Sequence, residues 1–514
     1  MRRLVLVTLC ALLLTPTGVS AQALPSVSLA RVRYSTRKAT VKPDGPLKTE
    51  IDAVDAAIAE ATRLGHTGEV RRQLARGITL LEGRAWTPVL DLEAALVLRA
   101  ERTIVDPQSP YAVRLEQIYR PVAELTPALS VVMRLERRAA VSAPQTAPPA
   151  LTLVRELGAF DGVSRDLRES PFAMEVDLSS VADGTYVLEA ELRDGTAALA
   201  MASLQVVVHH GLDAHLRALE SAAVTAPPSV RADLRYPADY IRRVNLGRVT
   251  LGNFNLVAEL AAADIVAAGA RGGKDPFATR TGDFERHHWL DGANEVMPYR
   301  VYVPTTYAPS RALPLVIALH GLGGTEDSFF ESYAKLTPKL AEQHGFLLAA
   351  PLGYRVDGFY GSPLMGASDV TAKRRSEYSE RDVLEVLRLM KAHYKVDESR
   401  IYLLGHSMGA IGVWALAAKY PEVWAAAVPF SGVGSPLLAE RMKAIPQFVV
   451  HGDADPTVNV NGSRVMVAAL QKLEAPVTYV EVPGGNHTDV VVPHLPQAFV
   501  FMAGQRKTAA TNQQ

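Results

Sequence analysis

The residues with the clearest chemical potential are Gly405-His406-Ser407-Met408-Gly409, a G-x-S-x-G pentapeptide. The apolar run 400–404 before it predicts a short buried strand, and the alanine-rich run 410–420 after it predicts a helix that ends before Pro421. A strand, a tight turn flanked by glycines and a helix form a nucleophile elbow. The glycines let strand and helix pack closely, so the hydroxyl of Ser407 is predicted to be an exposed nucleophile at the helix N-terminus.

A serine hydroxyl needs a neighbouring base, and the base needs an acid to orient it. Two later loops supply these groups in the chain order serine, acid, histidine, and each loop follows a predicted strand. The carboxyl ends of parallel strands share one edge of a sheet, so these loops can meet there. We predict Ser407 as nucleophile, His487 as general base and then acid, and Asp455 as the orienting carboxylate. Asp453 is the alternative acid.

The tetrahedral intermediate of acyl transfer also needs N–H donors aimed at its oxyanion. The amide of Met408 opens the elbow helix and is one predicted donor. The loop 320–324 follows another predicted strand and contains three glycines, so the amide of Leu322 is the second. Tyr354 and Tyr360 lie in a later loop that is expected to overhang the site, and we predict that they contact the substrate.

The remaining histidines predict no metal site. The pairs His209-His210 and His287-His288 are adjacent in sequence, so their side chains point to opposite faces of a strand. Phosphate-binding glycine loops are also missing from the sequence, and we therefore expect neither a metal nor a nucleotide cofactor.

Composition places the chain among ordinary globular proteins. Of its 514 residues, 48% are hydrophobic and 21% charged, and the formal net charge is +0. Without a charge excess, recruitment to nucleic acid or to an anionic membrane is not expected. After residue 23 no apolar run approaches the length of a membrane helix, so no membrane span is predicted.

Residues 1–23 are typical of a secretory signal peptide. Arg2-Arg3 precede the apolar run 4–14, and Ala21-Gln22-Ala23 offers small residues for cleavage. Cys10, the only cysteine, lies inside this segment, so the mature chain would have no disulfide and no cysteine-ligated metal. We expect a secreted or periplasmic protein.

Changes in hydrophobic period predict the organisation of the mature chain. Apolar residues recur at three- and four-residue steps through much of 46–104, including 90–98, and again after 211. Period-two segments with Asp-Gly turns lie between them. The predicted strands of that part are 129–135, 172–178, 185–192 and 200–208. We divide the mature chain into a helical region at 24–124, a small immunoglobulin-like β-sandwich at 125–210, a helical connector at 211–280, a catalytic domain at 281–505 and a disordered tail at 506–514.

Within the catalytic domain, strands and helices alternate. Its apolar strands are predicted at 313–319, 346–350, 401–404, 425–430, 448–450 and 477–482, with helices at 331–344, 380–394, 409–420, 436–443 and 461–474. Near-continuous apolar strands separated by helices indicate a parallel sheet covered on both faces. The fold class is therefore α/β, with a doubly wound, mostly parallel sheet. Trp289 and residues 298–303 are expected to add antiparallel strands at its edge.

Residues 283–503 resemble the α/β-hydrolase superfamily. Within it they are similar to secreted esterases grouped with polyhydroxybutyrate depolymerases and feruloyl esterases, and to the hydrolase domain of prolyl-oligopeptidase-like peptidases. The resemblance rests on the segments 298–304, 319–324, 400–409, 451–455 and 484–487. It implies the same triad and the same two oxyanion amides. Ala410 and Asn486 depart from the family pattern, which frequently has glycine at both positions.

From these features we expect a serine hydrolase that cleaves carboxylic esters, free or attached to a polymer or glycan, through an acyl-enzyme. A peptidase of the prolyl-oligopeptidase type is the first alternative. A second is a polymer- or glycan-binding protein with an accessory hydrolase. A catalytically inactive scaffold is disfavoured because every catalytic position is filled.

Overall fold

The computed structural model describes residues 27–123, 125, 128–139, 150–252, 254–362 and 370–507. The predicted signal peptide and most of the predicted tail lie outside the described residues. The chain divides into two compact units, which are described separately. One unit contains Asp55–His215 and Ile241–Phe254, and the other contains Pro25–Val54, Leu216–Tyr240 and Asn255–Gln514. Among the helices described, none combines the length and apolar character that crossing a membrane requires.

The first unit contains two sheets that share one hydrophobic core. The smaller sheet has the order β1-β3-β6 and is antiparallel; its strands are Leu96–Ala100, Tyr111–Gln117 and Phe172–Val176. The larger has the order β2-β8-β7-β4-β5; its strands, in chain order, are β2 (Ile104–Val105), β4 (Leu129–Arg138), β5 (Leu151–Val163), β7 (Gly184–Asp194) and β8 (Ala197–Val208). Val113 and Leu115 of one sheet and Met133 and Leu188 of the other belong to the same buried cluster.

The prediction of a purely helical region at 24–124 is wrong for residues 96–117. Helices α3 (Thr67–Leu81) and α4 (Pro88–Ala95) are present, but α4 ends where β1 begins. Leucines at 96 and 98 suit a strand as well as a helix, and pairing with β3 decides between the two. The strand β3 has a two-residue period of buried side chains that the helical interpretation overlooked. The four predicted strands exist as β4, β6, β7 and β8, divided between the two sheets.

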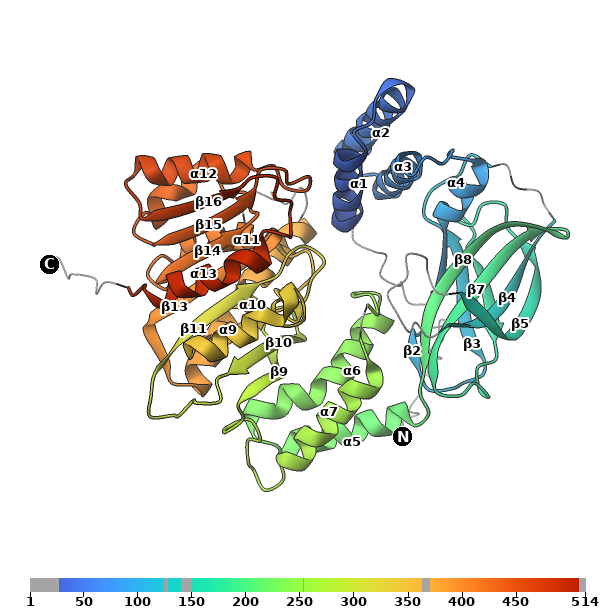
Figure 1. The fold of residues 1–514 in the computed structure, drawn as a ribbon. Helices are drawn as coiled ribbons and strands as arrows, with labels where there is room; N and C mark the ends of the chain where they lie inside the picture. Colours follow the sequence, from blue (N-terminus) through green and yellow to red (C-terminus); the bar gives the residue numbers. More distant parts are fainter. Residues whose placement is uncertain are drawn as a thin grey trace, which may run out of the picture. The chain divides into compact units, whose positions relative to one another are not determined.

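The second unit is built on an eight-stranded sheet with the order β16-β15-β14-β13-β11-β12-β10-β9, which Figure 1 shows from red to yellow-green. Its strands are β9 (Gly282–Leu290), β10 (Glu295–Val303), β11 (Leu313–Leu319), β12 (Leu347–Pro351), β13 (Val396–His406), β14 (Ala426–Phe430), β15 (Gln447–Gly452) and β16 (Val477–Val482). Strands β11 to β16 are parallel, whereas β10 is antiparallel to both β9 and β12. The predicted parallel strands and antiparallel edge are confirmed.

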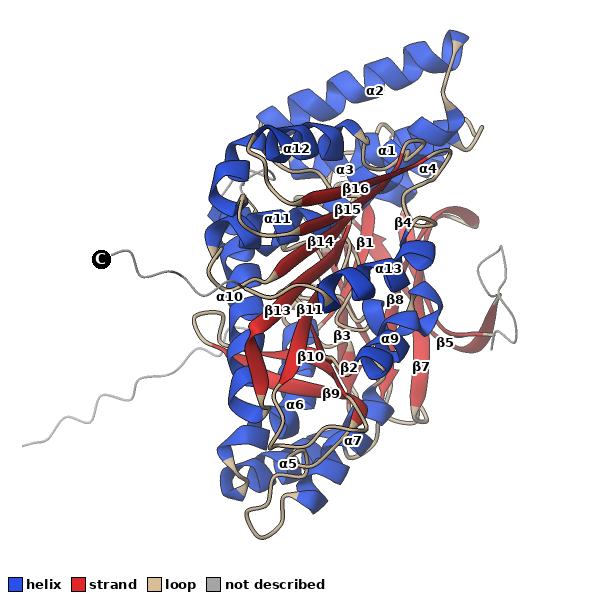
Figure 2. Cartoon of the chain, turned by 60° about the vertical axis from the view of Figure 1, so that its left-hand side comes forward, coloured by secondary structure: helices blue, strands red, loops and turns tan. Residues whose placement is uncertain are grey.

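Helices cover both faces of this sheet. Figure 2 shows α10, α11 and α12 along one face, and α9 and α13 along the other. The helices that lie wholly in this unit are α1 (Val27–Val41), α7 (Leu256–Gly269), α8 (Ser328–Glu331), α9 (Leu336–His344), α10 (Val370–His393), α11 (Met408–Lys419), α12 (Asn461–Lys472) and α13 (Val491–Ala503). Three further helices have residues in both units: α2 (Gly45–Arg63), α5 (Leu212–Thr225) and α6 (Arg231–Asn245). The helix predicted at 436–443 is a 3-10 helix, α1 lies within the helical region predicted at 24–124, and α13 was not predicted.

The elbow helix α11 is apolar on all sides because it lies inside the domain. Every residue from Met408 to Ala418 is buried, and Trp414 is fully enclosed. The indole N–H of Trp414 donates to Oε1 of buried Gln447 on β15 over 2.9 Å. One side chain thus joins the helix behind the nucleophile to a strand two positions along the sheet.

We expect the substitution Trp414→Ala to lower the free energy of unfolding by about 3–5 kcal/mol, because it empties a closed site and leaves the Gln447 amide without its donor. The half-exposed Trp289 is the matched control, and Trp289→Ala is expected to lower the free energy of unfolding by about 0.5 kcal/mol or less. Urea unfolding followed by far-UV circular dichroism measures both. Equal losses in the two variants would contradict this account of the core.

Candidate active site

Ser407 lies in a strained turn between β13 and α11. Its backbone has φ 58° and ψ −118°, a conformation that side-chain-bearing residues rarely adopt. The flanking glycines make this turn feasible: a Cβ on Gly409 would lie 1.9 Å from the carbonyl oxygen of Leu319, and one on Gly405 would lie 2.4 Å from the oxygen of Gly409. The predicted close packing of strand and helix at these glycines is confirmed.

The structure brings together the three residues predicted as a triad. Oγ of Ser407 lies 2.9 Å from Nε2 of His487, and Nδ1 of His487 lies 2.7 Å from Oδ2 of Asp455. The three side chains come from the loops after β13, β15 and β16, which are parallel and therefore end at the same edge. The imidazole can accept the serine proton at one nitrogen while the other donates to the carboxylate.

The Asp455 carboxylate is fully enclosed and saturated with donors. Its Oδ1 accepts the backbone N–H groups of Thr457 and Val458 over 2.7 and 2.9 Å. Its Oδ2 faces both His487 and Nε2 of His451, the latter at 3.2 Å. Burial by itself raises the pKa of Asp455, but the hydrogen bonds from the two histidines outweigh it and hold this pKa well below its usual range. The carboxylate is therefore ionised throughout the neutral range.

Asp453, the alternative acid, does not reach the imidazole in this arrangement. Its Oδ1 accepts the backbone N–H of Gly484 over 2.7 Å, and its own N–H donates to Val482. It therefore ties the loop after β15 to the loop that carries His487. Its position fits a structural role at the edge of the site.

His406 has a larger part than the sequence suggested. Its Nε2 lies 2.8 Å from the carbonyl oxygen of His487, and its Nδ1 lies 2.9 Å from the hydroxyl of Tyr333. These contacts fit a neutral ring that donates to His487 and accepts from Tyr333. Burial, followed by the charge of His487, lowers the pKa of His406 to about 4. The position beside the nucleophile was visible in the sequence, but its two partners come from loops that only folding brings close.

The two predicted oxyanion donors border Ser407. A Cβ on Gly321 would lie 3.3 Å from Cβ of Ser407, so the loop carrying Leu322 passes directly beside the nucleophile. Among the described backbone hydrogen bonds outside regular helices and strands, none is donated by the amides of Leu322 or Met408. His320 holds this loop, because its Nε2 lies 2.7 Å from the carbonyl oxygen of Leu352.

The predicted substrate contact of Tyr360 is wrong. Its side chain is fully buried, its hydroxyl donates to the carbonyl oxygen of His320 over 3.2 Å, and its ring fills the space beside Gly412 on α11. Tyr360 thus supports the loop 320–324 from inside the domain. Tyr354 is half-buried, with its ring 5.0 Å from that of Tyr378, and its contact with a substrate stays a prediction.

Helix α1 also borders the site, which the sequence did not indicate. A Cβ on Gly323 would lie 2.8 Å from Cδ2 of Leu29, so this leucine packs on the oxyanion loop. The hydroxyls of Thr36 and Thr457 lie 3.3 Å apart, at the loop that carries the acid. The helix therefore limits the space available beside the nucleophile.

We expect Asp455→Asn to lower kcat for p-nitrophenyl acetate by about 10³–10⁴-fold, because an amide stabilises neither the required tautomer nor the imidazolium. Asp453→Asn is the matched control. It keeps an oxygen that can accept the Gly484 N–H and removes only the charge, so kcat is expected to fall by less than about tenfold. Steady-state kinetics of both variants decide the assignment, and the opposite order of effects would transfer the role to Asp453.

The lowered pKa of His406 predicts a stability that depends on pH. His406 is neutral in the folded protein but is protonated more readily in the unfolded chain. Its contribution to the free energy of unfolding is therefore complete above about pH 6.5 and is lost as the pH falls toward 4. At pH 5 this loss amounts to about 2 kcal/mol. The destabilisation caused by His406→Gln should therefore be about 2 kcal/mol smaller at pH 5 than at pH 7.5. Urea unfolding at the two pH values measures it; a pH-independent difference would argue against a buried neutral ring.

Known proteins resemble the part of the chain that contains this site. Residues 292–510 match the model of the family Esterase, described as "Putative esterase". Feruloyl esterase B of Neurospora crassa is 31% identical over 164 residues, which are 31% of this chain and 51% of that protein. Acetylxylan esterase A of Aspergillus oryzae is 28% identical over 145 residues, which are 28% of this chain and 44% of that protein. The chain thus spans about half or less of the length of these curated relatives.

Among solved structures, a thermostable esterase is similar with a TM-score of 0.39 and 18% identity, covering 80% of this chain and 100% of that one. A ferulic acid esterase from Anaeromyces mucronatus is similar with a TM-score of 0.36 and 17% identity, covering 45% of this chain and 95% of that one. The family match covers the eight-stranded sheet from the β9–β10 turn onward, together with all three side chains around Ser407. Residues 292–510 thus match the esterase family model, and they contain seven of the eight strands of this sheet.

Proposed function

We propose that this chain is a serine hydrolase that cleaves carboxylic esters through an acyl-enzyme. The observation that carries the proposal is the continuous line of contacts from Oγ of Ser407 through His487 to Asp455, with distances of 2.9 and 2.7 Å. An alcohol, an imidazole and an ionised carboxylate in this order are what nucleophilic acyl transfer requires.

In the proposed reaction, Oγ of Ser407 attacks the ester carbonyl while Nε2 of His487 takes the hydroxyl proton. The negative charge that develops on the carbonyl oxygen is stabilised by the amides of Leu322 and Met408. The imidazolium, stabilised by Asp455, then gives its proton to the leaving alcohol as the C–O bond breaks. Water next attacks the acyl-enzyme with the same base, and Ser407 regains its proton when the acid leaves.

For the substrate class, we propose esters of small acyl groups or aryl acids carried by a glycan. The support is the similarity of residues 292–510 to esterases named for feruloyl and acetylxylan esters. Helix α1 and the buried Tyr360 leave the loop around Tyr354 as the part of the site best placed to distinguish acyl groups. The signal-peptide pattern of residues 1–23 supports the further proposal that the enzyme is exported, where such esters are found.

The decisive variant is Ser407→Ala, tested against p-nitrophenyl acetate, methyl ferulate, acetylated xylan and a proline-containing peptide anilide. We expect hydrolysis of the preferred ester to fall by at least about 10⁴-fold, because the nucleophile is lost. Ser221→Ala, at an exposed serine of α5, is the control and should keep full activity. Far-UV circular dichroism checks that both variants are folded.

Two results would count against the proposal. Ester hydrolysis that survives in Ser407→Ala would remove the assigned nucleophile. A wild-type protein that cleaves the peptide anilide faster than every ester would favour the peptidase alternative.

A further inference from the structure

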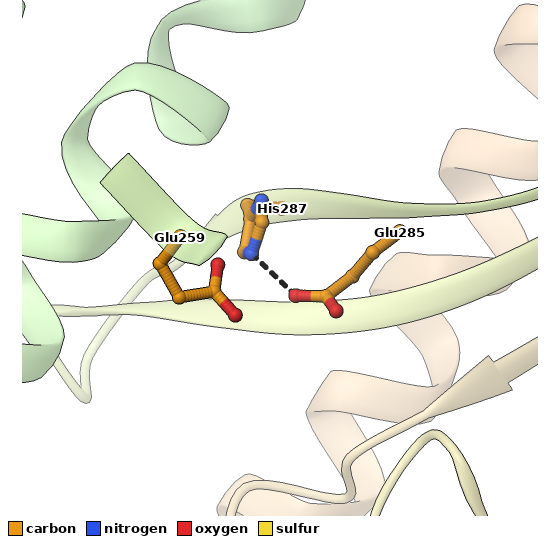
Figure 3. Close-up of side chains that lie close together, drawn as sticks. All are labelled: Glu259, Glu285 and His287. Carbon is orange, nitrogen blue, oxygen red and sulfur yellow. Dashed lines mark ion pairs between the residues drawn. The ribbon is translucent and has the colours of Figure 1, made fainter. Parts of the chain in front are cut away.

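A second group of chemically active side chains lies on β9, α7 and the loop after β11. Glu259 of α7 and Glu285 and His287 of β9 place one ligand atom each within 4.8 Å of one another. Figure 3 shows these three side chains gathered at one place. Glu285 also belongs to a neighbouring group of the same size with Glu326 and Asp327. One carboxylate thus joins two sets of ligand atoms.

The strand period explains why the sequence did not reveal this group. His287 and His288 do point to different partners: Nε2 of His288 lies 2.7 Å from Oδ1 of Asp382 on α10. The partner of His287 is two residues earlier, because residues i and i+2 of a strand share a face. Glu259 is distant in sequence, and only packing of α7 beside β9 brings it to that face.

The contacts that fix the ring of His287 are of the kind that orient metal-binding histidines. Its Nδ1 lies 3.2 Å from Oδ1 of Asp233 on α6, and its ring stacks on Tyr236 with centroids 3.8 Å apart. A carboxylate that accepts from one imidazole nitrogen directs the lone pair of the other nitrogen outward, as in carboxylate–histidine–metal arrangements. That other nitrogen, Nε2, lies 2.8 Å from Oε1 of Glu285.

Nε2 of His287 and Oε1 of Glu285 form an ion pair, and Nε2 has no hydrogen bond of regular geometry among the described residues. Two donor atoms that share one cation at about 2.0–2.2 Å lie roughly 3 Å apart and point at the ion instead of at each other. The observed pair has that separation.

Glu326 provides an independent observation. It is only 7% exposed, and its Oε2 is buried without a hydrogen-bond partner among the described residues. An isolated buried carboxylate oxygen is costly, so such oxygens normally have a partner. The nearby cation Arg300 does not provide one, because it pairs with Asp327 and also with Asp283 and Glu331.

We propose that Glu259, Glu285 and His287 bind a divalent transition-metal ion of the Mn²⁺ or Zn²⁺ type, with Glu326 as a further carboxylate on the other side of Glu285. An imidazole nitrogen combined with carboxylate oxygens suits these ions, whereas Ca²⁺ and Mg²⁺ prefer oxygen alone. The bound ion would join α7 to β9 and to the loop that follows Gly324, and so anchor the far end of the oxyanion loop.

The test uses the untagged full-length protein, stripped with a chelator and dialysed, because a histidine tag binds the same metals. Isothermal titration with Zn²⁺, Mn²⁺ and Ca²⁺ should give about one equivalent of Zn²⁺ or Mn²⁺ and weaker binding of Ca²⁺. The same metal should raise the thermal midpoint by several degrees, on the order of 2–4 °C or more at saturating concentration. Both readouts are independent of esterase activity.

Glu285→Gln should weaken binding of the transition metal by at least about tenfold, since it removes the shared ligand. Glu259→Gln is a second ligand variant on a half-exposed helix position, in case Glu285→Gln does not fold. His287→Gln should weaken Zn²⁺ more than Ca²⁺. The matched control is Glu331→Gln, which removes a neighbouring carboxylate that contacts Arg300 but lies outside the group, and it should bind as the wild type does.

Three outcomes would overturn the proposal: no metal bound by the stripped wild type, equal affinity in Glu259→Gln and wild type, or tightest binding of Ca²⁺ without an effect of His287→Gln. The last outcome would show an all-oxygen site and exclude the imidazole as a ligand.

Discussion

The ionised carboxylate of Asp455 is the group on which the geometry around Ser407 depends. A buried charge is tolerated only when donors surround it, and this one has two backbone amides and two imidazoles. These donors come from its own loop, from the end of β15 and from the loop after β16. Satisfying one charge therefore fixes three pieces of backbone at the same sheet edge, and it orients His487 toward the nucleophile as a consequence.

The strain at Ser407 requires the rest of the domain to be rigid. A residue with a side chain pays of order 1–3 kcal/mol to occupy such a conformation, and it stays there only if its surroundings leave no alternative. Here the amide of Ser407 donates to Phe430 over 2.9 Å, and Gly409 packs on the carbonyl of Leu319. The enclosed helix α11 holds these contacts in place. The burial of Trp414 far from the surface is thus part of how the hydroxyl is presented.

The carboxylates around Asp455 and around Glu285 differ in the number of hydrogen-bond donors that surround them. Around Asp455 every oxygen has donors, and the pKa falls. Around Glu285, by contrast, Glu326 has a buried oxygen without a hydrogen-bond partner among the described residues. The first region is satisfied by donors of the chain itself, whereas the second has the ligand atoms of the cation site that we propose. The same rule about buried carboxylates leads to opposite conclusions because the local donors differ.

The local features of this protein follow from residue type and spacing. The alternating apolar strands, the glycine-flanked Ser407 and the loops holding Asp455 and His487 depend on residue type and spacing within a few positions, so they could be recognised without a structure. The choice of Asp455 over Asp453 rested on position in the loop, and the distances now support that choice. The two-residue period of β3 is visible in the sequence, but the predicted helical region was extended from the periodic part at 46–104 to residue 124 and so included this strand.

Which distant groups meet depends on how the elements pack in three dimensions. The inward turn of Tyr360, the double contact of His406, the packing of α1 on the oxyanion loop and the group around Glu285 all join residues far apart in the chain. Periodicity reports which face of an element a side chain occupies, but not which other element covers that face. Which element covers a face depends on the packing of the whole domain. This packing in turn determines which charges are neutralised and which buried oxygens are left without a donor.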